Sequence, residues 1–265
     1  RHCRTSAARG ASCAGGSRQD PSTALNAVTT GYVQAIELDS SQLPGAEAAG
    51  MKIKATPTLV QHMLFLDRKE TFANENVRKA VCYAINIPAV ALGGYNGYAK
   101  PVPQRFEAGQ SGFDPTVRGY NHDPAVAKKF MAAAGNPKLS FTLPMYTGNQ
   151  TAMMLISQQL RAIGIEAKPQ LMTSGQYFTF YQTDKYPLQV NSSATENIGP
   201  LDYYQFRFAT GGVGNPFRVA VPELDAIARR ALTETTEEGQ NKIWQEMTRY
   251  IHDRALDCGY YQWQT

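Results

Sequence analysis

The segment from Lys138 to Leu171 constrains the fold most, because its hydrophobic pattern changes period twice. "KLSFTLPMY" alternates in the manner of a strand, and "IEAKPQL" returns to a strand pattern. Between them, "NQTAMMLISQQLRAIG" places its apolar residues along one side of a helix. A strand, a helix and a strand in this order predict a right-handed βαβ unit with parallel strands. The predicted fold class is therefore α/β.

Capping residues mark the ends of one further helix. In "DPAVAKKFMAAAG", Asp123 stands at the N-cap, Pro124 at the first helical position and Gly135 just beyond the last turn. Apolar residues at helical spacing also predict two late helices, from Pro222 to Thr235 and from Glu237 to Arg254.

The stretch "FANENVRKAVCYAIN", residues 72–86, predicts a helix that packs on one face. Asn74 or Asn76 is placed to cap it, and apolar residues recur three or four positions apart. We expect Arg78 and Lys79 to point away from that apolar face. The remaining expected elements are a short helix from 24, strands at 32–36 and about 59–66, a short helix at 86–94, a long loop to 122, a helix from 174 to about 183, and a strand at 187–193.

The composition indicates a globular protein and argues against two classes. The chain has 265 residues, of which 43% are hydrophobic, so it can bury a sizeable core. Its formal charge of +4 is thinly spread outside the N-terminus, which disfavours a nucleic-acid-binding protein. No run of about 18 apolar residues is present, and no signal peptide is recognisable in the chain. Residues 1–22 lack large apolar side chains and are expected to be disordered.

The four cysteines, Cys3, Cys13, Cys82 and Cys258, lie far apart in the sequence. They show no CxxC motif and no spacing with histidine that would suggest a zinc site, and they do not suggest a disulfide framework. We expect Cys82 to be a small buried apolar residue rather than a reactive thiol. The cellular compartment therefore cannot be read from these cysteines.

Motifs that would indicate an enzyme are missing from the sequence. None of the candidate nucleophiles or bases stands in a GxSxG, HExxH or phosphate-loop context. His62, His122 and His252 lack the spacing of metal ligands. We expect no catalytic residue, no metal and no cofactor.

Four segments, taken in order, resemble the C-terminal half of the extracellular solute-binding proteins of family 5, the oligopeptide and dipeptide receptors of ABC importers. "TFANENVRKAVCYAIN" is similar to the family's "PF.D.RVRQA..YAID", and "GFDPTVRGYNHDPAVAKKFMAAAG" to its "YDP.KAK.LL.EAG". "ISQQLRAIGIEAK" resembles "IQ..L..IGI.V", and "VPELDAIARRALTETTEEGQNKIWQEMTRYIHD" resembles the pattern of the family's late helices. Each motif alone is weakly specific, and the order of all four carries the resemblance.

The resemblance implies a periplasmic-binding-protein-like fold of the class II type, with two α/β lobes that close over a ligand at a hinge. In this framework, residues 1–22 are foreign to the family, and residues 23–70 are a remnant of the first lobe and the crossover. Residues 71–265 form the second lobe, which stops before its return to the first lobe. The chain is thus expected to be a partial two-lobe receptor, with Arg78 in a structural role.

The resemblance also implies a ligand site without a catalytic residue. In peptide-binding members an acidic residue pairs with the ligand's ammonium group, and Glu196 in "NSSATENIGPLDYY" matches its position. The other expected ligand-binding residues are Ser193, Asn197, Tyr203, Tyr204, Tyr146 and Asn149. No Arg or Lys occurs in the 146–149 turn, where dipeptide receptors carry an arginine, which disfavours strict dipeptide specificity.

Three functional alternatives remain open at this stage. The first is a substrate-binding component that captures peptides and partners ABC permease subunits, monomeric and without nucleic acid. The second is the same receptor with a metal chelate, a sugar or an opine as ligand. The third is an isolated lobe that binds nothing tightly, because one wall of the cleft is missing. The complete protein is expected in the periplasm or outside the cell, with a lipid anchor as one possibility, although this chain shows no export signal.

Overall fold

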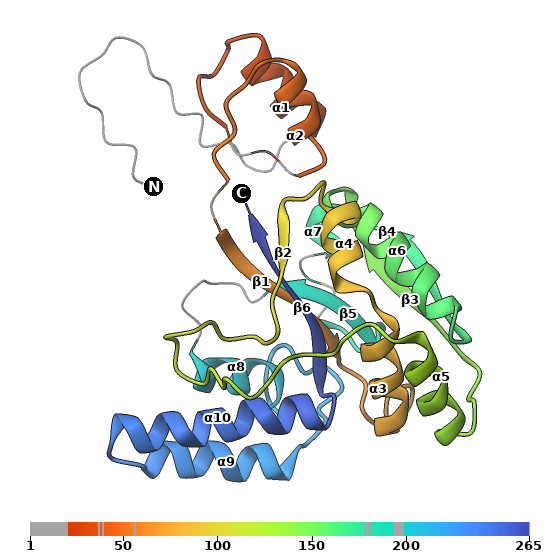
Figure 1. The fold of residues 1–265 in the computed structure, drawn as a ribbon, viewed down its shortest axis with the longest axis vertical. Helices are drawn as coiled ribbons and strands as arrows, with labels where there is room; N and C mark the ends of the chain where they lie inside the picture. The colour runs from red at the N-terminus through yellow and green to blue at the C-terminus, as the bar shows by residue number, and fades with distance from the viewer. Residues whose placement is uncertain are drawn as a thin grey trace.

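The computed structural model describes residues 21–36, 38, 40–55, 57–177, 179, 182–192 and 199–264 (Figure 1). The strands are β1 (Pro57–Phe65), β2 (Ala99–Pro101), β3 (Leu139–Met145), β4 (Ile165–Leu171), β5 (Leu188–Ser192) and β6 (Asp257–Gln264). The α-helices are α1 (Pro21–Thr29), α2 (Leu43–Ala48), α3 (Glu75–Ala84), α4 (Ile87–Gly94), α5 (Pro124–Ala133), α6 (Gln150–Arg161), α7 (Ser174–Tyr177), α8 (Pro200–Arg207), α9 (Pro222–Thr233) and α10 (Glu237–Asp253).

The strands form two sheets, and the larger one is antiparallel. Its order is β2-β6-β1-β5, so the last strand of the chain lies in the interior of the sheet. The smaller sheet pairs β3 with β4 in parallel, with Leu139 opposite Ile165 and Met145 opposite Leu171. Helix α6 connects these two strands. The predicted βαβ unit and the α/β class are therefore confirmed.

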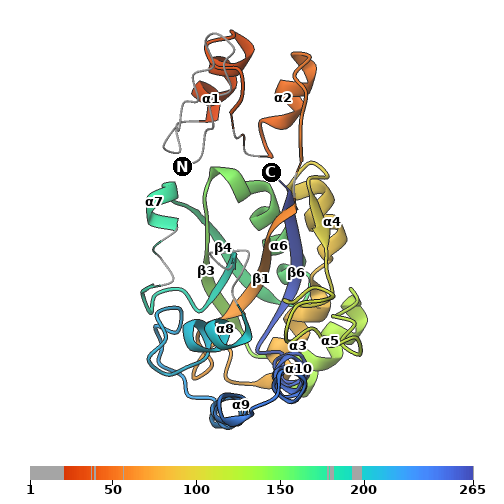
Figure 2. The ribbon, with the colours of Figure 1, turned by 90° about the vertical axis from the view of Figure 1, so that its left-hand side faces the viewer.

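Two hydrophobic clusters hold these layers together. The larger one joins the inner residues of β1, β5 and β6 to α3, α4, α6 and the β3–β4 pair, and Phe65, Val81 and Ile156 are among its fully buried members. The second cluster joins α8, α9 and α10 through residues such as Leu224 and Met247. Figures 1 and 2 show α9 and α10 as a hairpin at one end of the molecule, while α1 and α2 lie at the opposite end.

The predicted helix caps are present. The Asp123 carboxylate accepts hydrogen bonds from the amides of Ala125 and Val126, at 3.0 and 2.9 Å, where α5 begins. Asn74 caps α3 by accepting from the amide of Asn76 at 2.9 Å. Both side chains satisfy first-turn amides that the helix itself cannot bond.

Three predicted segments differ in the structure. The loop expected to run to residue 122 contains the short strand β2, which pairs with β6. Residues 32–36 do not form a strand, and Tyr32 is 79% exposed. An apolar run becomes a strand only when a neighbouring strand bonds its backbone, and none of the described strands pairs with this segment. The helix expected from 174 to about 183 is described over Ser174–Tyr177, and Thr179 already lies in a turn, while residues 178, 180 and 181 lie outside the described residues.

The expectation for the cysteines was wrong. Cys82 on α3 and Cys258 on β6 form a disulfide across 176 positions of sequence, with their Cα atoms 5.9 Å apart. Both residues are buried, as expected for Cys82. Their pairing depends on α3 lying against the interior strand β6, which the spacing of cysteines in the sequence does not reveal. Cys3 and Cys13 lie outside the described residues.

The helical pattern predicted that Arg78 points away from the apolar face, and this prediction was wrong, because the Arg78 side chain is buried. It is 6% exposed, and its guanidinium group donates to the carbonyls of Phe72 and Ala73 at one side and of Arg254 and Ala255 at the other. It therefore joins the start of α3 to the turn that follows α10, which agrees with the structural role implied by the family resemblance.

Helices α1 and α2 form a separate unit on the side where β1 begins and β6 ends (Figure 1). The Asn96 amide donates to the carbonyl of Ser40 at 2.8 Å, and the Tyr98 hydroxyl donates to Glu47. The boundary expected near residue 70 stays a prediction, but β1 itself lies within the main sheet. Among the described helices, none is both long and apolar enough to cross a membrane.

Candidate functional site

The first group of predicted site residues lies at the C-terminal end of β3. The Asn149 side chain accepts a hydrogen bond from the amide of Tyr146 at 2.9 Å and donates to the hydroxyl of Tyr177 at 2.8 Å. The Tyr177 hydroxyl in turn donates to the carbonyl of Val190 on β5 at 2.5 Å. Ligands of α/β proteins commonly bind beyond such strand ends.

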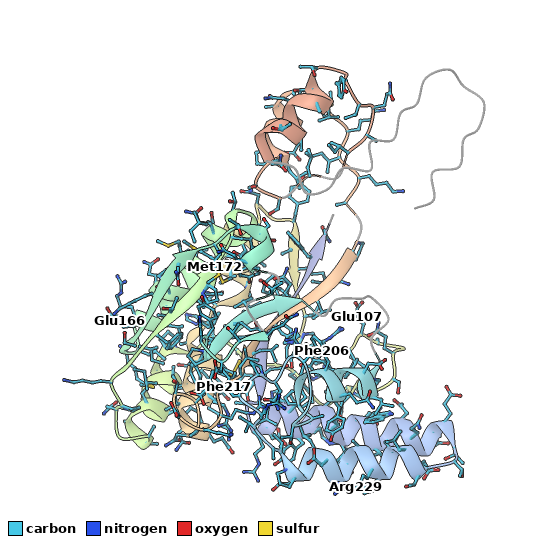
Figure 3. The ribbon with its side chains drawn as sticks, turned by 180° about the vertical axis from the view of Figure 1, so that it is seen from behind. Glu107, Glu166, Met172, Phe206, Phe217 and Arg229 are labelled. Carbon is cyan, nitrogen blue, oxygen red and sulfur yellow. A yellow bond between two sulfur atoms is a disulfide. The ribbon has the colours of Figure 1, made fainter. Side chains whose placement is uncertain are left out.

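In this structure Tyr146 and Asn149 are 7% and 2% exposed, and both ends of the Asn149 amide are bonded within the lobe. The Tyr146 and Tyr177 rings lie 4.7 Å apart, and Met172 packs against them just beyond β4, at the position labelled in Figure 3. Tyr177 was not predicted as a site residue. Tyr146, Tyr177 and Met172 thus form a small hydrophobic cluster beyond the ends of β3 and β4.

The second group lies on α8, in another part of the lobe (Figures 1 and 2). Tyr204 is partly buried and donates from its hydroxyl to Asp225 of α9 at 2.6 Å. Burial and this hydrogen bond to Asp225 raise the pKa of Tyr204 to about 12. Tyr203 is 2% exposed and faces the sheet. The remaining predicted site residues, Ser193, Glu196 and Asn197, lie outside the described residues.

Sequence reasoning missed a set of buried polar side chains behind α8, which we term the α8 cluster. Its members come from β1, β6, α8 and two loops: His62, Arg68, Arg105, Tyr203, Arg207 and Asp257. The Tyr203 hydroxyl donates to the Asp257 carboxylate, and His62 Nε2 lies 3.6 Å from the same oxygen, Asp257 Oδ2. None of the six residues is more than 9% exposed. No short motif contains them, so only the tertiary structure brings them together.

Electrostatics in the α8 cluster are dominated by burial. Loss of water raises the pKa of Asp257 well above its usual range, although Arg105 and Arg68 oppose this shift. Burial, followed by repulsion from Arg207 and Arg105, holds the pKa of His62 well below 6.5. Burial likewise lowers the pKa of Arg68 to about 10. The histidine is therefore neutral at physiological pH.

The outer side of α8 borders a shallow hollow of about 380 Å³. It is lined by Asp202, Gln205, Phe206, Gly211, Gly212 and Val213, and Figure 3 labels Phe206 on this helix. No group of three or more histidine, cysteine or acidic side chains within the described part of the chain is placed to hold a metal ion.

The sequence model for "bacterial extracellular solute-binding proteins, family 5 Middle" matches residues 18–215. The chain belongs to this family. Proteins of family 5 bind peptides or other small molecules outside the cytoplasm and work with ABC permeases. The expected fold, periplasmic-binding-protein-like and covering part of a two-lobe receptor, is thereby confirmed.

Among curated relatives, the chain is 31% identical to the glutathione-binding protein GsiB of Escherichia coli K12 over 135 residues. That match covers 48% of the chain and 25% of GsiB. Among solved structures, DppA of Helicobacter pylori in complex with the peptide STSA superimposes with a TM-score of 0.78 at 17% identity. AppA of Bacillus subtilis with a nonapeptide gives a TM-score of 0.77 at 17% identity. The chain is covered to 92% in both cases, and it spans 51% and 53% of the two family 5 receptors.

Proposed function

We propose that this chain contains the second lobe of the substrate-binding component of an ABC importer, and that its ligand is a peptide. The observation that carries the proposal is the family match over residues 18–215, together with a fold that superimposes on peptide-bound receptors over 92% of the chain. The protein would capture its ligand between two lobes and present it to permease subunits, acting as a monomer and without turnover.

The ligand contacts follow from the same proposal. Glu196 would accept a charge-assisted hydrogen bond from the peptide ammonium group, a contact worth roughly 1.5–3 kcal/mol. Ser193 and Asn197 would bond the adjacent backbone of the peptide. Tyr146 and Asn149 would form the part of the ligand site that lies at the end of β3, and Tyr203 and Tyr204 would support the site from α8.

The Cys82–Cys258 disulfide supports a location outside the cytoplasm. Disulfides persist in the periplasm and outside the cell, and they are rare in the reducing cytosol. We infer that the complete protein is exported to the periplasm or the cell surface, where a lipid anchor is one means of retention.

A non-peptide ligand is the second candidate. The 146–149 turn holds no basic side chain to receive a ligand carboxylate at that position. Related folds include AgaA in complex with agropinic acid, at 18% identity, and NikA of Brucella suis in complex with Fe(III)-EDTA, at 15% identity. The third candidate, a lobe that binds nothing tightly, rests on the half-length coverage of these receptors.

The proposal is tested by thermal unfolding of the purified chain with millimolar glutathione, the tetrapeptide Ser-Thr-Ser-Ala, agropinic acid or Fe(III)-EDTA. We expect the melting temperature to rise with a peptide, because a ligand that binds only the folded state stabilises it. Glu196→Gln should weaken binding about tenfold to a hundredfold, in line with one lost charge-assisted bond. The exposed Glu70→Gln serves as the matched control and should leave binding unchanged.

Each remaining outcome selects another candidate. A shift only with agropinic acid or the iron chelate would replace the peptide by that ligand class. A cooperative transition indifferent to every probe would favour the isolated lobe. An equal loss of affinity in Glu196→Gln and Glu70→Gln would exclude Glu196 as the ammonium partner.

A further inference from the structure

Helix α8 is too short to determine its own position. It has eight residues, and its N-cap residue, Gly199, makes no side-chain cap. Isolated helices of this length are marginal in water, so tertiary contacts must hold it. Two of those contacts involve adjacent tyrosines: Tyr204 bonds Asp225 on the outer side, and Tyr203 bonds Asp257 on the inner side.

The inner contact is unusual because it is polar and fully buried. Tyr203 lies among aromatic rings, with Phe106 at 6.0 Å and Phe208 at 5.4 Å between centroids. A phenylalanine would satisfy this packing equally well. The hydroxyl adds a desolvation cost that its bond to Asp257 offsets, with His62 Nε2 as a longer second partner at 3.4 Å. A buried polar pair of this kind often contributes more to geometry than to stability. What the pair specifies here is the orientation of α8 against β6.

The charges around Asp257 strengthen this assignment. Asp257 is the acidic member of the α8 cluster, and Arg105 and Arg68 oppose the rise that burial causes in its pKa. Asp67 and Glu107 act from outside the cluster, each on one of these arginines. Moreover, Asp257 directly precedes Cys258, whose disulfide to α3 fixes the start of β6. The acceptor for Tyr203 is thus held on a rigid part of the lobe.

We propose that Asp257 and Tyr203 are positioning residues that fix α8, and with it the ligand-facing side of the second lobe. The inference rests on the proposed function only in its consequence for ligand affinity. The docking of α8 itself can be measured without any ligand.

The test uses amide hydrogen exchange of the full chain, read separately for α8 and for α6. Tyr203→Phe, which removes the donor, and Asp257→Ala, which removes the acceptor, should each increase exchange in α8 about tenfold or more, while α6 keeps its protection. The double variant should exceed the larger single effect only slightly, because both changes break the same bond. Tyr95→Phe removes another buried tyrosine hydroxyl, bonded to Tyr261 at 2.7 Å, and should leave α8 unaffected.

Exchange in α8 that stays at the wild-type rate in Tyr203→Phe would overturn the proposal, and so would an equal increase throughout the lobe. Should Asp257→Ala fail to fold, Tyr203→Phe alone decides the question. Affinity for glutathione or Ser-Thr-Ser-Ala, measured on the same variants, should fall severalfold with Tyr203→Phe. Loosening of α8 with no probe binding even to the wild type would reject the peptide function and retain the positioning role.

Discussion

Arg78 is a single charged side chain that joins two distant parts of the chain. Its guanidinium reaches the carbonyls of Phe72 at 2.8 Å and Arg254 at 2.9 Å, on opposite sides. Only a planar group with several fixed donors can bond both sides at once, whereas a lysine ammonium is a compact point charge. The position therefore requires arginine for its shape as well as its charge.

Arg78→Lys should lower the free energy of unfolding by about 2–3 kcal/mol, because buried carbonyls lose their donors. Urea denaturation measures this change. The neighbouring Lys79 makes a partly exposed ion pair with Glu75 at 2.6 Å. Lys79→Ala should therefore lower the free energy of unfolding by only about 0.5 kcal/mol. Similar losses for the two variants would show that the guanidinium bonds contribute little.

His62 should make stability depend on pH. Its pKa in the folded protein lies well below 6.5, so the unfolded chain takes up a proton that the folded chain excludes. The resulting stability is present above pH 6.5 and is lost as the pH falls toward the folded value.

Between about pH 7.5 and 5.5, His62 should account for a loss on the order of 1 kcal/mol in the free energy of unfolding. His62→Gln removes this titration, so urea denaturation at the two pH values should show a smaller pH effect in the variant. Asp257 is present in both proteins and its titration cancels to first order. An identical pH dependence in the wild type and the variant would mean that His62 titrates normally in the fold.

At the scale of elements, the disulfide fastens helix α3 to the interior strand β6. The loop it closes spans 176 positions, so the cross-link restricts the unfolded chain strongly. It also fixes the start of β6, where Asp257 directly precedes Cys258. Cys82 and Cys258 thus stabilise the packing of α3 and anchor the α8 cluster.

The double substitution Cys82→Ala and Cys258→Ala should lower the free energy of unfolding by about 3–5 kcal/mol. Chemical denaturation under oxidising conditions measures the difference. Peptide mapping by mass spectrometry, with and without reduction, provides the check on pairing, since the peptides that contain Cys82 and Cys258 should be linked only before reduction. The prediction would be contradicted if a reductant removed the disulfide from the wild-type protein and left its denaturation midpoint unchanged.

At the scale of the whole molecule, the described chain consists of a large lobe and a small helical unit. The main sheet and both hydrophobic clusters lie within residues 57–264, while α1 and α2 form their own unit at the end where the β1 strand begins. The core of the large lobe is therefore built without the first 50 residues.

Deletion of residues 1–50 should leave the cooperative unfolding of the large lobe intact, with its melting temperature lowered by less than about 4 °C. Circular dichroism of the shortened chain measures this. A second variant, Tyr98→Phe, removes the bond to Glu47 without shortening the chain and should have an equally small effect. Loss of the transition on deletion would show that the large lobe is not stably folded without the small unit.

The sequence by itself determined the local elements and the family. Caps at Asp123 and Asn74, together with the two hydrophobic periods between 138 and 171, were enough to place α5, α3 and the βαβ unit, because these signals depend on residues a few positions apart. The four motifs were enough to indicate family 5. For the site, the sequence led to Tyr146, Asn149, Tyr203, Tyr204 and Glu196, and the ligand-binding role of each of these residues stays a prediction.

Only the tertiary structure decided which distant residues meet. Cys82 pairs with Cys258, and Tyr203 with Asp257, and in each pair the second residue lies on β6. The sequence of β6 itself shows little hydrophobic alternation. The run at 32–36 failed as a strand because pairing depends on a neighbour and not on the run itself. Long-range contacts of this kind leave no short-range signal, because burial of a charge or a thiol is set by the elements that close over it.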